Sequence, residues 1–459
     1  MKKLFLSTNE LDKNCIENLG LSELVLQENA ALGVANLIRQ KLDFGKKILF
    51  LCGGGNNASD AIAAARMLSG EYECELFLWS SNLNQNAKIQ LQITENVGVK
   101  IASEICEADC YVDGLLGSGL DRDLPQDLQD LLNSINQKPG LKIAVDVPTG
   151  LNKFGRLSPI CFKADFTVTM GARKIGLYSD LAKDFVGEIK LANLGICEDK
   201  FSGESRSFLL EMSDLELPKR DKQNVSKGDF GHAFVACGMM SGAAKIVAKA
   251  ALKMGAGRVS VVNLSDKQII LDDEIMLKNS FKLASSVAIG MGLGVARFDL
   301  GDFITLPCVV DADMFYRDEV FNLATSQKAV LTPHPKEFAN LLKIASFGEF
   351  SVEEVQSSRL EFAIEFSSKF ACVLVLKGAN TLIAQKGNVY ISPFGTPALS
   401  VGGSGDALSG IILGLLAQGY SPLNAAISGV LAHAKTALNF KANAYSFTPN
   451  DIIEGIKWL

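Results

Sequence analysis

Residues 401–410 read VGGSGDALSG, a glycine-rich turn that leads directly into an apolar helix. The first turn of a helix presents backbone N–H groups that have no partner within the helix, so it can hold the charge of a transferring phosphoryl group. Asp406 stands beside this turn, where it can take a proton from an attacking hydroxyl group. Close packing of the helix against a sheet would explain the glycines but not the aspartate. The stretch therefore predicts a phosphoryl-transfer site at the start of a helix.

Short apolar runs alternate with helical patterns along the whole chain. In the first half the runs are 46–53, 73–79, 108–114, 141–147 and 165–171. In the second half they are 232–238, 258–264, 286–292, 308–313, 329–334 and 372–378. Continuous apolar runs indicate strands that are buried on both faces, as in a parallel sheet with helices on each side. The predicted fold class is therefore α/β, with two doubly wound, mostly parallel sheets.

A charged segment at 211–229 separates the two halves. No apolar period runs through it, which indicates a linker. The 459 residues are enough for two domains of ordinary size. We expect a doubly wound, Rossmann-like domain at 1–212, a linker at 213–225 and a second doubly wound α/β domain at 226–459.

Composition excludes several classes of protein. Hydrophobic residues make up 48% of the chain and charged residues 21%, which is typical of a globular protein. The formal net charge of −6 argues against a nucleic-acid binder that relies on overall positive charge. The ten cysteines form no CxxC pair and most lie in apolar runs, so we expect buried, reduced thiols in a cytoplasmic protein.

Membrane insertion and secretion are not expected. The apolar run at the N-terminus is too short for a signal peptide. The uncharged stretch 407–434 contains glycines, a proline and a QGYSP turn, so we expect two buried helices rather than one membrane span.

Three strand ends in the first half carry glycine-rich or polar sequence. They read GGGNNASD at 53–60, DGLLGSGL at 113–120 and DVPTGL at 146–151. Open parallel sheets bind ligands beyond the carboxyl ends of their strands, and glycines there let the backbone approach a ligand closely. Gathered carboxylates can hold a cation or act as general acids and bases. Taken singly, each residue has an ordinary alternative, such as Ser59 or Asp60 capping a helix.

These three motifs resemble the epimerase domain of the NAD(P)H-hydrate repair enzymes. That domain interconverts the R and S epimers of NADH or NADPH hydrated at C6 of the nicotinamide ring. The resemblance implies that Asp146 lies at the reacting centre and that Asn57, Asp113 and Thr149 hold a potassium ion. It implies hydrate binding by Asn56, Asn57, Ala58, Ser59, Asp60, Gly117, Ser118, Gly119, Leu120, Asp121, Arg122, Asp123 and Asp146. Where the family usually has Asn-Asn-Gly-Gly-Asp-Gly, residues 56–61 read NNASDA, and each added Cβ narrows the permitted backbone.

Further motifs follow the predicted strands of the second half. LKGANT at 376–381 stands where a nucleotide phosphate contact would, and TPHPKE at 332–337 places His334 between two prolines on a rigid, exposed turn. GMGLG at 290–294 follows another strand. With KGDFGHAFVACG, SGAAKIVAKAALKMGAG and GTPALSVGGSGDALSGIILGLLAQG, these motifs resemble the ADP-dependent NAD(P)H-hydrate dehydratases of the ribokinase-like superfamily, in the order of that family.

The second resemblance implies that Asp406 is the base for phosphoryl transfer and that Mg²⁺ helps to stabilise the transferred charge. The implied contacts to ADP are Lys377, Gly378, Ala379, Asn380, Thr381 and Gly405. The implied contacts to the hydrate are Ala243, Gly292, His334 and Asp406. The family commonly has His-Pro-Gly-Glu where residues 334–337 read HPKE.

Together the two resemblances span nearly the whole chain and predict a multifunctional enzyme, an isomerase followed by a lyase. The first half would equilibrate the epimers, and the second would dehydrate the S epimer to NAD(P)H, giving AMP and phosphate. One alternative is a ribokinase-like kinase for a vitamin precursor with a non-catalytic first half, and another is a nucleotide sensor without turnover. The sequence also leaves open whether ATP replaces ADP as the phosphoryl donor and whether the protein forms a homo-oligomer. The expected partners are small molecules, with no nucleic acid and no membrane.

Overall fold

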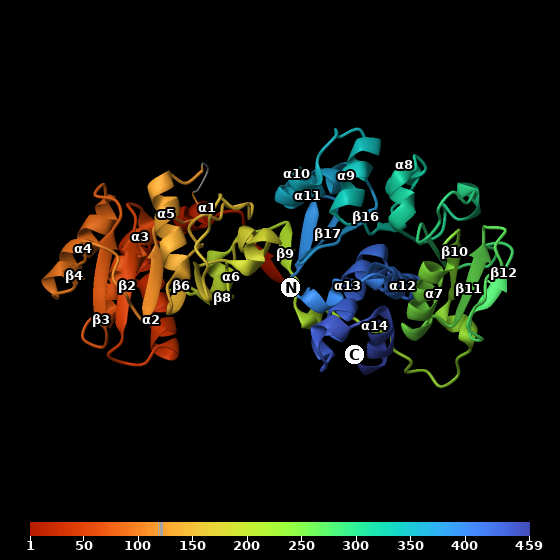
Figure 1. The fold of residues 1–459 in the computed structure, drawn as a ribbon, viewed down its shortest axis with the longest axis horizontal. Helices are drawn as coiled ribbons and strands as arrows, with labels where there is room; N and C mark the ends of the chain where they lie inside the picture. Colours follow the sequence, from red (N-terminus) through yellow and green to blue (C-terminus); the bar gives the residue numbers. More distant parts are fainter. Residues whose placement is uncertain (118, 120–122) are drawn as a thin grey trace. The chain divides into compact units, whose positions relative to one another are not determined.

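The computed structural model describes residues 1–117, 119 and 123–459, and its chain divides into two compact units (Figure 1). The first unit is Lys3–Ser205, and the second is Arg206–Leu459 together with residues 1–2. Each apolar run that the sequence marks out contains a strand. The α/β class is therefore confirmed.

The first unit contains a parallel sheet in the order β4-β3-β2-β5-β6-β7-β8. Its strands are β2 (Lys47–Cys52), β3 (Glu73–Leu78), β4 (Lys100–Ile101), β5 (Cys110–Gly114), β6 (Leu141–Val145), β7 (Phe166–Met170) and β8 (Glu188–Ala192). Its helices are α1 (Asn9–Glu17), α2 (Glu23–Lys41), α3 (Asn56–Leu68), α4 (Gln85–Asn96), α5 (Gln126–Gln137) and α6 (Glu198–Phe201). Alternate residues of β2 enter different apolar clusters: Phe50 packs with α2 and α3, whereas Leu51 packs with α5. The sheet is thus buried on both faces, as its continuous apolar runs predict.

The second unit is built on a longer, mixed sheet in the order β1-β9-β18-β17-β16-β15-β14-β13-β10-β11-β12. Its parallel central strands are β10 (His232–Cys237), β11 (Arg258–Asn263), β12 (Met276–Lys278), β13 (Ser286–Ile289), β14 (Cys308–Val310), β15 (Ala329–Leu331) and β16 (Val373–Leu376). Toward the other edge follow β17 (Thr381–Gln385) and β18 (Asn388–Ser392), both paired antiparallel, then β9 (Ser207–Leu209) and β1 (Lys2–Leu4). The helices are α7 (Ser241–Lys253), α8 (Val320–Ala324), α9 (Pro335–Ile344), α10 (Val352–Ser357), α11 (Arg359–Lys369), α12 (Ser404–Ala417), α13 (Pro422–Asn439) and α14 (Pro449–Gly455).

The segment at 211–229 contains no strand and no α-helix, only two short 3-10 turns. It runs over the second unit, where the Glu216 carbonyl accepts a hydrogen bond from the Tyr420 hydroxyl (3.3 Å) and Leu217 packs against the core. Just before it, β9 pairs in parallel with β18. The boundary between the two compact units therefore falls after residue 205. The domain bounds 1–212 and 226–459, which were expected from the sequence, stay a prediction.

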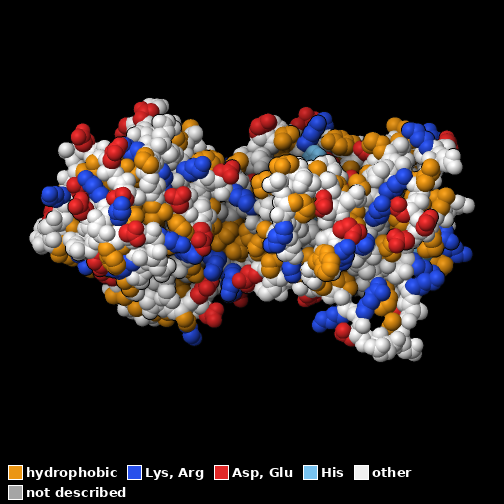
Figure 2. Space-filling view, turned by 60° about the horizontal axis from the view of Figure 1, so that its bottom comes forward, with side chains coloured by type: hydrophobic (Ala, Val, Ile, Leu, Met, Phe, Trp, Pro, Cys, Tyr) orange, Lys and Arg blue, Asp and Glu red, His pale blue; other side chains and the backbone are white. Residues whose placement is uncertain are grey.

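Two helices occupy the uncharged stretch, as expected. Both α12 and α13 are buried over most of their length. Within the described residues, no helix has the length and apolar character needed to cross a bilayer. All ten cysteines are free thiols, and all but Cys106 and Cys197 are buried. On the face seen in Figure 2, basic and acidic side chains are interspersed.

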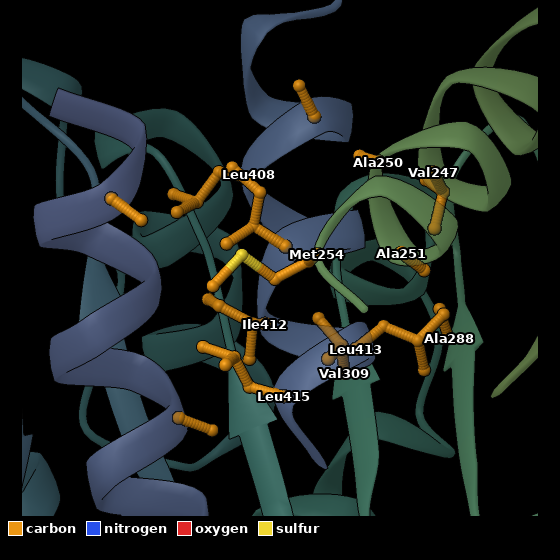
Figure 3. Packing of buried hydrophobic residues seen from close by; sticks show 14 of the residues in the cluster. Val247, Ala250, Ala251, Met254, Ala288, Val309, Leu408, Ile412, Leu413 and Leu415 are labelled. Atoms are coloured by element: carbon orange, nitrogen blue, oxygen red, sulfur yellow. The ribbon is translucent and has the colours of Figure 1, made fainter. Parts of the chain in front are cut away.

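Helix α12 is fixed by close packing against α7 (Figure 3). Leu408 and Ile412 of α12 lie beside Met254 at the end of α7, while Leu413 faces Ala288 and Val309 of the sheet. A Cβ on Gly410 would lie 2.4 Å from the Val247 carbonyl oxygen, closer than real Cβ atoms come. The helix that carries Asp406 can therefore shift little relative to the sheet.

We predict that Gly410→Ala destabilises the second unit and that Gly402→Ala does not. Alanine improves helix propensity by about 1 kcal/mol, but overpacking against fixed backbone costs about 1–3 kcal/mol. A Cβ on Gly402 meets nothing within 4 Å, so this variant is the matched control. Hydrogen exchange of the β13 and β14 amides should show a lower opening free energy in Gly410→Ala than in the unaltered chain. In Gly402→Ala the opening free energy should be unchanged. Equal protection in both variants would contradict this role of Gly410.

Candidate active sites

The first candidate site lies where β5 and β6 end. Asp113, the fourth residue of β5, is completely buried and accepts hydrogen bonds from the Thr149 N–H (2.7 Å), the Thr149 hydroxyl (2.7 Å) and the Leu115 N–H (3.1 Å). Burial raises the pKa of Asp113 to about 6, although the Thr149 bonds lower it. Among the described residues, no cationic side chain pairs with this carboxyl group.

Of the three residues implied in potassium binding, two contact the Leu116 carbonyl group and the third contacts one of these two. The Leu116 oxygen accepts hydrogen bonds from Asn57 Nδ2 (3.1 Å) and from the Thr149 hydroxyl (3.2 Å), and Thr149 in turn contacts Asp113. Carboxylate, hydroxyl, amide and carbonyl oxygens form the donor set that hard cations prefer. A cation here would also compensate a buried carboxylate that otherwise has only neutral partners. These residues therefore fit a potassium ion.

Asp146 follows β6 and has a left-handed backbone conformation, with φ of 66°. Its Oδ1 atom accepts hydrogen bonds from Lys174 Nζ (2.5 Å), from the Met170 N–H (3.1 Å) and from the Thr169 hydroxyl (3.4 Å). The Lys174 side chain is only 2% exposed, against 14% for Asp146. The ion pair brings together the ends of two adjacent strands, β6 and β7.

Residues 56–60 form the first turns of α3. Gly55 is the N-cap, so neither Ser59 nor Asp60 caps the helix. Asn56 is exposed, and its side chain forms hydrogen bonds with Glu23 and Asn84. The side chains that follow are buried: Asn57 and Asp60 are 8% exposed, and Ala58 and Ser59 are fully buried. Because α-helical backbone suits residues with a Cβ, the departure from the family's glycines imposes no backbone strain. Ala61 is accommodated by Gly114, where a Cβ would lie 2.5 Å from that of Ala61.

The glycines at 53–54 are required by the packing of the unit's own backbone, whatever contact they make with a ligand. A Cβ on Gly53 would lie 1.9 Å from the Leu115 carbonyl oxygen, and one on Gly54 would lie 2.4 Å from the Asn82 carbonyl oxygen. They therefore allow close approach of the unit's own backbone. Of the three glycines at 53–55, Gly55 alone has no atom within 4 Å of an added Cβ.

Part of the implied hydrate site lies outside the described residues, namely Ser118, Leu120, Asp121 and Arg122. Of the rest, Gly117 lies against Asn57, where a Cβ would be 3.4 Å from Oδ1. Gly119 and Asp123 are exposed.

The second candidate site is centred on the start of α12. The helix begins at Ser404, and Gly403, with φ of 86°, provides the left-handed turn before it. The glycine-rich turn and the helix are thus confirmed. Burial raises the pKa of Asp406 to about 6, as does Asp311, while Lys377 lowers it.

Lys377 lies over the first turn of α12. Its Nζ contacts Asp311 Oδ1 at 2.8 Å, and a Cβ on Gly405 would lie 3.3 Å from this Nζ. The Asp311 side chain is 3% exposed and accepts a second hydrogen bond, from Ser409 on α12 (2.9 Å). Burial alone would lower the pKa of Lys377, but Asp311 and Glu337 outweigh it, so the pKa is raised and the ammonium keeps its charge.

His334 and Glu337 form a capping box at the start of α9. The Glu337 carboxylate accepts from the His334 N–H at 2.8 Å, and His334 Nδ1 accepts from the Glu337 N–H at 3.3 Å. His334 is 47% exposed, in agreement with the prediction of an exposed turn, whereas Glu337 is 8% exposed and lies 3.7 Å from Lys377 Nζ. Burial raises the pKa of Glu337 to about 7, although Lys377 lowers it.

The remaining implied contacts lie on loops around this centre. Gly378 and Ala379 are exposed, Asn380 is buried, and Thr381 begins β17. Arg359 holds this loop by donating to the carbonyl groups of Leu376 (2.9 Å) and Lys377 (3.0 Å). Ala243 lies in the first turn of α7. Gly292 approaches Met240, the N-cap of that helix, and its carbonyl accepts the Met240 N–H at 3.0 Å.

Sequence reasoning missed Lys174, Asp311, Ser409 and the coupling of Glu337 to Lys377. Two of these carried a usable signal, because Asp311 directly follows the apolar residues 308–310 and Lys174 lies three residues after the apolar run 165–171. The strand-end rule that selected Asp113 and Asp146 applies to both of them. Among the described residues, no group of three or more His, Cys, Asp or Glu side chains could hold a metal ion.

Known proteins match both halves of the chain. Residues 233–457 match the NAD(P)H-hydrate dehydratase family, and residues 23–176 match the YjeF-related protein N-terminus. The bifunctional NAD(P)H-hydrate repair enzyme Nnr of Helicobacter pylori is 41% identical over 474 residues, which cover 100% of both chains. Its Escherichia coli counterpart is 31% identical over 93% of this chain and 87% of that one. The ADP/ATP-dependent NAD(P)H-hydrate dehydratase of Bacillus subtilis, crystallised with ATP and Mg²⁺, is 25% identical over 53% of this chain and 92% of its own, with a TM-score of 0.43.

We predict that Glu337 makes the second unit less stable as pH rises. Burial raises its pKa in the folded state to about 7, above the ordinary value of 4.5 for a glutamate side chain. Between these values the unfolded state loses the proton while the folded state keeps it, so up to about 3 kcal/mol of stability is lost on going from acid to neutral pH. Glu337→Gln should flatten this part of the stability profile, measured by urea denaturation at a series of pH values. Glu353→Gln, on the exposed side of α10, should leave the profile unchanged, and a profile that Glu337→Gln also leaves unchanged would contradict the assignment.

Proposed function

The chain belongs to the family of bifunctional NAD(P)H-hydrate repair enzymes, and on that premise we propose which residues of each unit perform the two reactions. The first unit interconverts the R and S epimers of the hydrate, and the second removes water from the S epimer with ADP as phosphoryl donor. The match of both halves favours this activity over a vitamin-precursor kinase or a nucleotide sensor. A kinase would accumulate a phosphorylated product, whereas the dehydratase releases phosphate.

The dehydration requires that a poor leaving group be converted into a good one. The hydrate carries a hydroxyl group at C6, next to the ring nitrogen, and hydroxide leaves slowly near neutral pH. Transfer of the terminal phosphoryl group of ADP to this oxygen releases AMP. The nitrogen lone pair then expels phosphate together with the C–O bonding electrons, and loss of a proton from C5 restores the dihydronicotinamide ring.

The observation that supports this proposal most strongly is the position of Asp406 in the first turn of α12, beside the Lys377–Asp311 pair. With a pKa of about 6, Asp406 is ionised at neutral pH and can take the proton of the C6 hydroxyl group. The amides of the turn and the Lys377 ammonium group would stabilise the charge of the phosphoryl group in transfer. Mg²⁺ would be bound mainly through the phosphates, as is usual for nucleotides, and would neutralise part of their charge.

The epimerisation requires that the C6 centre be opened and closed again. We assign Asp146 as the base that takes the hydroxyl proton. The O–H electrons then form a carbonyl group, the C6–N1 bond breaks with its pair going to the ring nitrogen, and that nitrogen takes a proton from solvent. Closure on the other face of the carbonyl reverses each transfer. Asn57, Asp113 and Thr149 would hold a potassium ion, which would supply positive charge beside the hydrate.

Replacement of Asp406 by Asn should separate the two activities. We expect ADP-dependent recovery of NADH from the S epimer to fall by about 10³-fold, within the range for loss of a general base. Exchange between the epimers should continue at the unaltered rate because it belongs to the other unit. In the unaltered chain, kcat/KM for recovery should fall as pH drops below about 6, where Asp406 takes up a proton. Recovery by Asp406→Asn at the unaltered rate would overturn the assignment of the base.

Replacement of Asp113 by Asn should weaken the dependence of epimer exchange on potassium. Loss of the only charged ligand among the three should raise the potassium concentration for half-maximal exchange by about 10–100-fold, the effect usual for residues that support a metal site. The measurement is a potassium titration of exchange, with ADP-dependent recovery of the S epimer as an internal control. Asp127→Asn, at an exposed position in α5, should leave the titration unchanged. A titration that is identical for Asp113→Asn and the unaltered chain would exclude Asp113 as a ligand.

A further inference from the structure

Lys174 is a buried cation of the first unit to which no step above gives a role. It lies between β7 and the 3-10 turn Ile175–Tyr178, and its Nζ donates to the Met170 carbonyl at 3.3 Å as well as to Asp146. The backbone on both sides is tied to Phe5, whose N–H donates to the Arg173 carbonyl at 2.9 Å and whose carbonyl accepts the Ile175 N–H at 2.8 Å. The ammonium group is therefore held at a fixed point beneath Asp146.

The hydrogen bonds of Asp146 are concentrated on one of its two carboxylate oxygens. Oδ1 accepts from Lys174, from the Thr169 hydroxyl and from the Met170 N–H, whereas no described residue donates to Oδ2. The left-handed backbone at Asp146 is sparsely populated by residues other than glycine, so these contacts hold a conformation that is unfavourable by itself. One oxygen is thus anchored, and the other keeps its lone pairs for a reactant.

Three carboxyl groups, those of Asp12, Asp60 and Asp146, interact electrostatically with Lys174. Burial raises the pKa of Asp12 to about 6 and that of Asp60 well above its ordinary value, and the negative charge of Asp146 raises both further. Lys174 lowers the pKa of both groups from a distance, but of the three carboxyl groups only that of Asp146 forms a hydrogen bond with its ammonium group. The ammonium group therefore neutralises the carboxylate of Asp146 directly, whereas burial favours the protonated forms of Asp12 and Asp60.

We propose that Lys174 is the positioning residue of the epimerase site, which anchors Oδ1 of Asp146 and turns the carboxylate so that Oδ2 faces the hydroxyl group of the hydrate. This inference rests on the epimerase activity proposed above. In this role Lys174 does not touch the hydrate. Its loss should therefore slow the proton transfer without weakening the binding of the hydrate, which distinguishes positioning from substrate binding.

The test uses the full-length chain and the purified S epimer without ADP, with the appearance of the R epimer followed by chromatography. Lys174→Met keeps the length of the side chain and removes its charge. We expect kcat to fall by about 100-fold or more, as for impaired general-base catalysis, with KM changed less than about threefold. Lys174→Arg keeps the charge and should recover part of kcat. Lys163→Met, at an exposed position of the same unit, should exchange the epimers at the unaltered rate.

A double variant shows whether Lys174 acts through Asp146. Asp146→Asn combined with Lys174→Met removes both charges together and should be no slower than Asp146→Asn alone. Hydrogen exchange of the β5 and β6 amides reports whether the first unit of each variant is folded, and ADP-dependent recovery of the S epimer reports on the second unit. Unaltered exchange in Lys174→Met would overturn the inference, as would equal loss in Lys174→Met and Lys174→Arg with a raised KM. Absence of exchange in the unaltered chain would instead overturn the proposed epimerase activity.

Discussion

An ion pair between a lysine and a strand-end aspartate, with at least one partner buried, is the interaction on which both sites depend. Lys174 meets Asp146 at 2.5 Å in the first unit, and Lys377 meets Asp311 at 2.8 Å in the second. A buried ammonium group is tolerated only beside an opposite charge, so each pair fixes the ends of two strands relative to each other. Because these ends lie at the ligand-binding edge of a parallel sheet, the stabilising contact and the reactive groups occupy the same place. Removing either partner would therefore disturb the chemistry as well as the fold.

The two pairs serve different chemistry. In the first unit the aspartate of the pair is itself the proposed base, and neutral oxygen donors around Asp113 offer a place for a cation. In the second unit the pair faces the start of α12, where the lysine and the helix N-terminus would present positive charge to a phosphoryl group, and Asp406 is the proposed base. The second reaction consumes one epimer, so an epimerase in the same chain makes the other epimer available to it.

Patterns within short segments predicted most of the fold, because continuous apolar runs are specific to strands buried on both faces. The strand-end rule likewise found Asp113, Asp146 and Lys377. Partners such as Lys174, Asp311 and Ser409 were missed because their pairing depends on tertiary contacts between distant segments. Ser59 and Asp60 were considered as helix caps because such residues favour that position, whereas α3 already begins at Asn56 with Gly55 as its N-cap. Glycines required by the chain's own backbone, such as Gly53, cannot be told by sequence from those that approach a ligand, because both positions exclude a Cβ.

The central claim is that two sites in one chain carry out consecutive steps on the same hydrate. The most direct test supplies the full-length chain with the purified R epimer of NADH hydrate and ADP, and follows the absorbance of reduced nicotinamide together with AMP and phosphate. The account predicts complete recovery of NADH, with one AMP and one phosphate formed for each molecule recovered. Failure to recover NADH from the R epimer, while the S epimer is recovered fully, would contradict it.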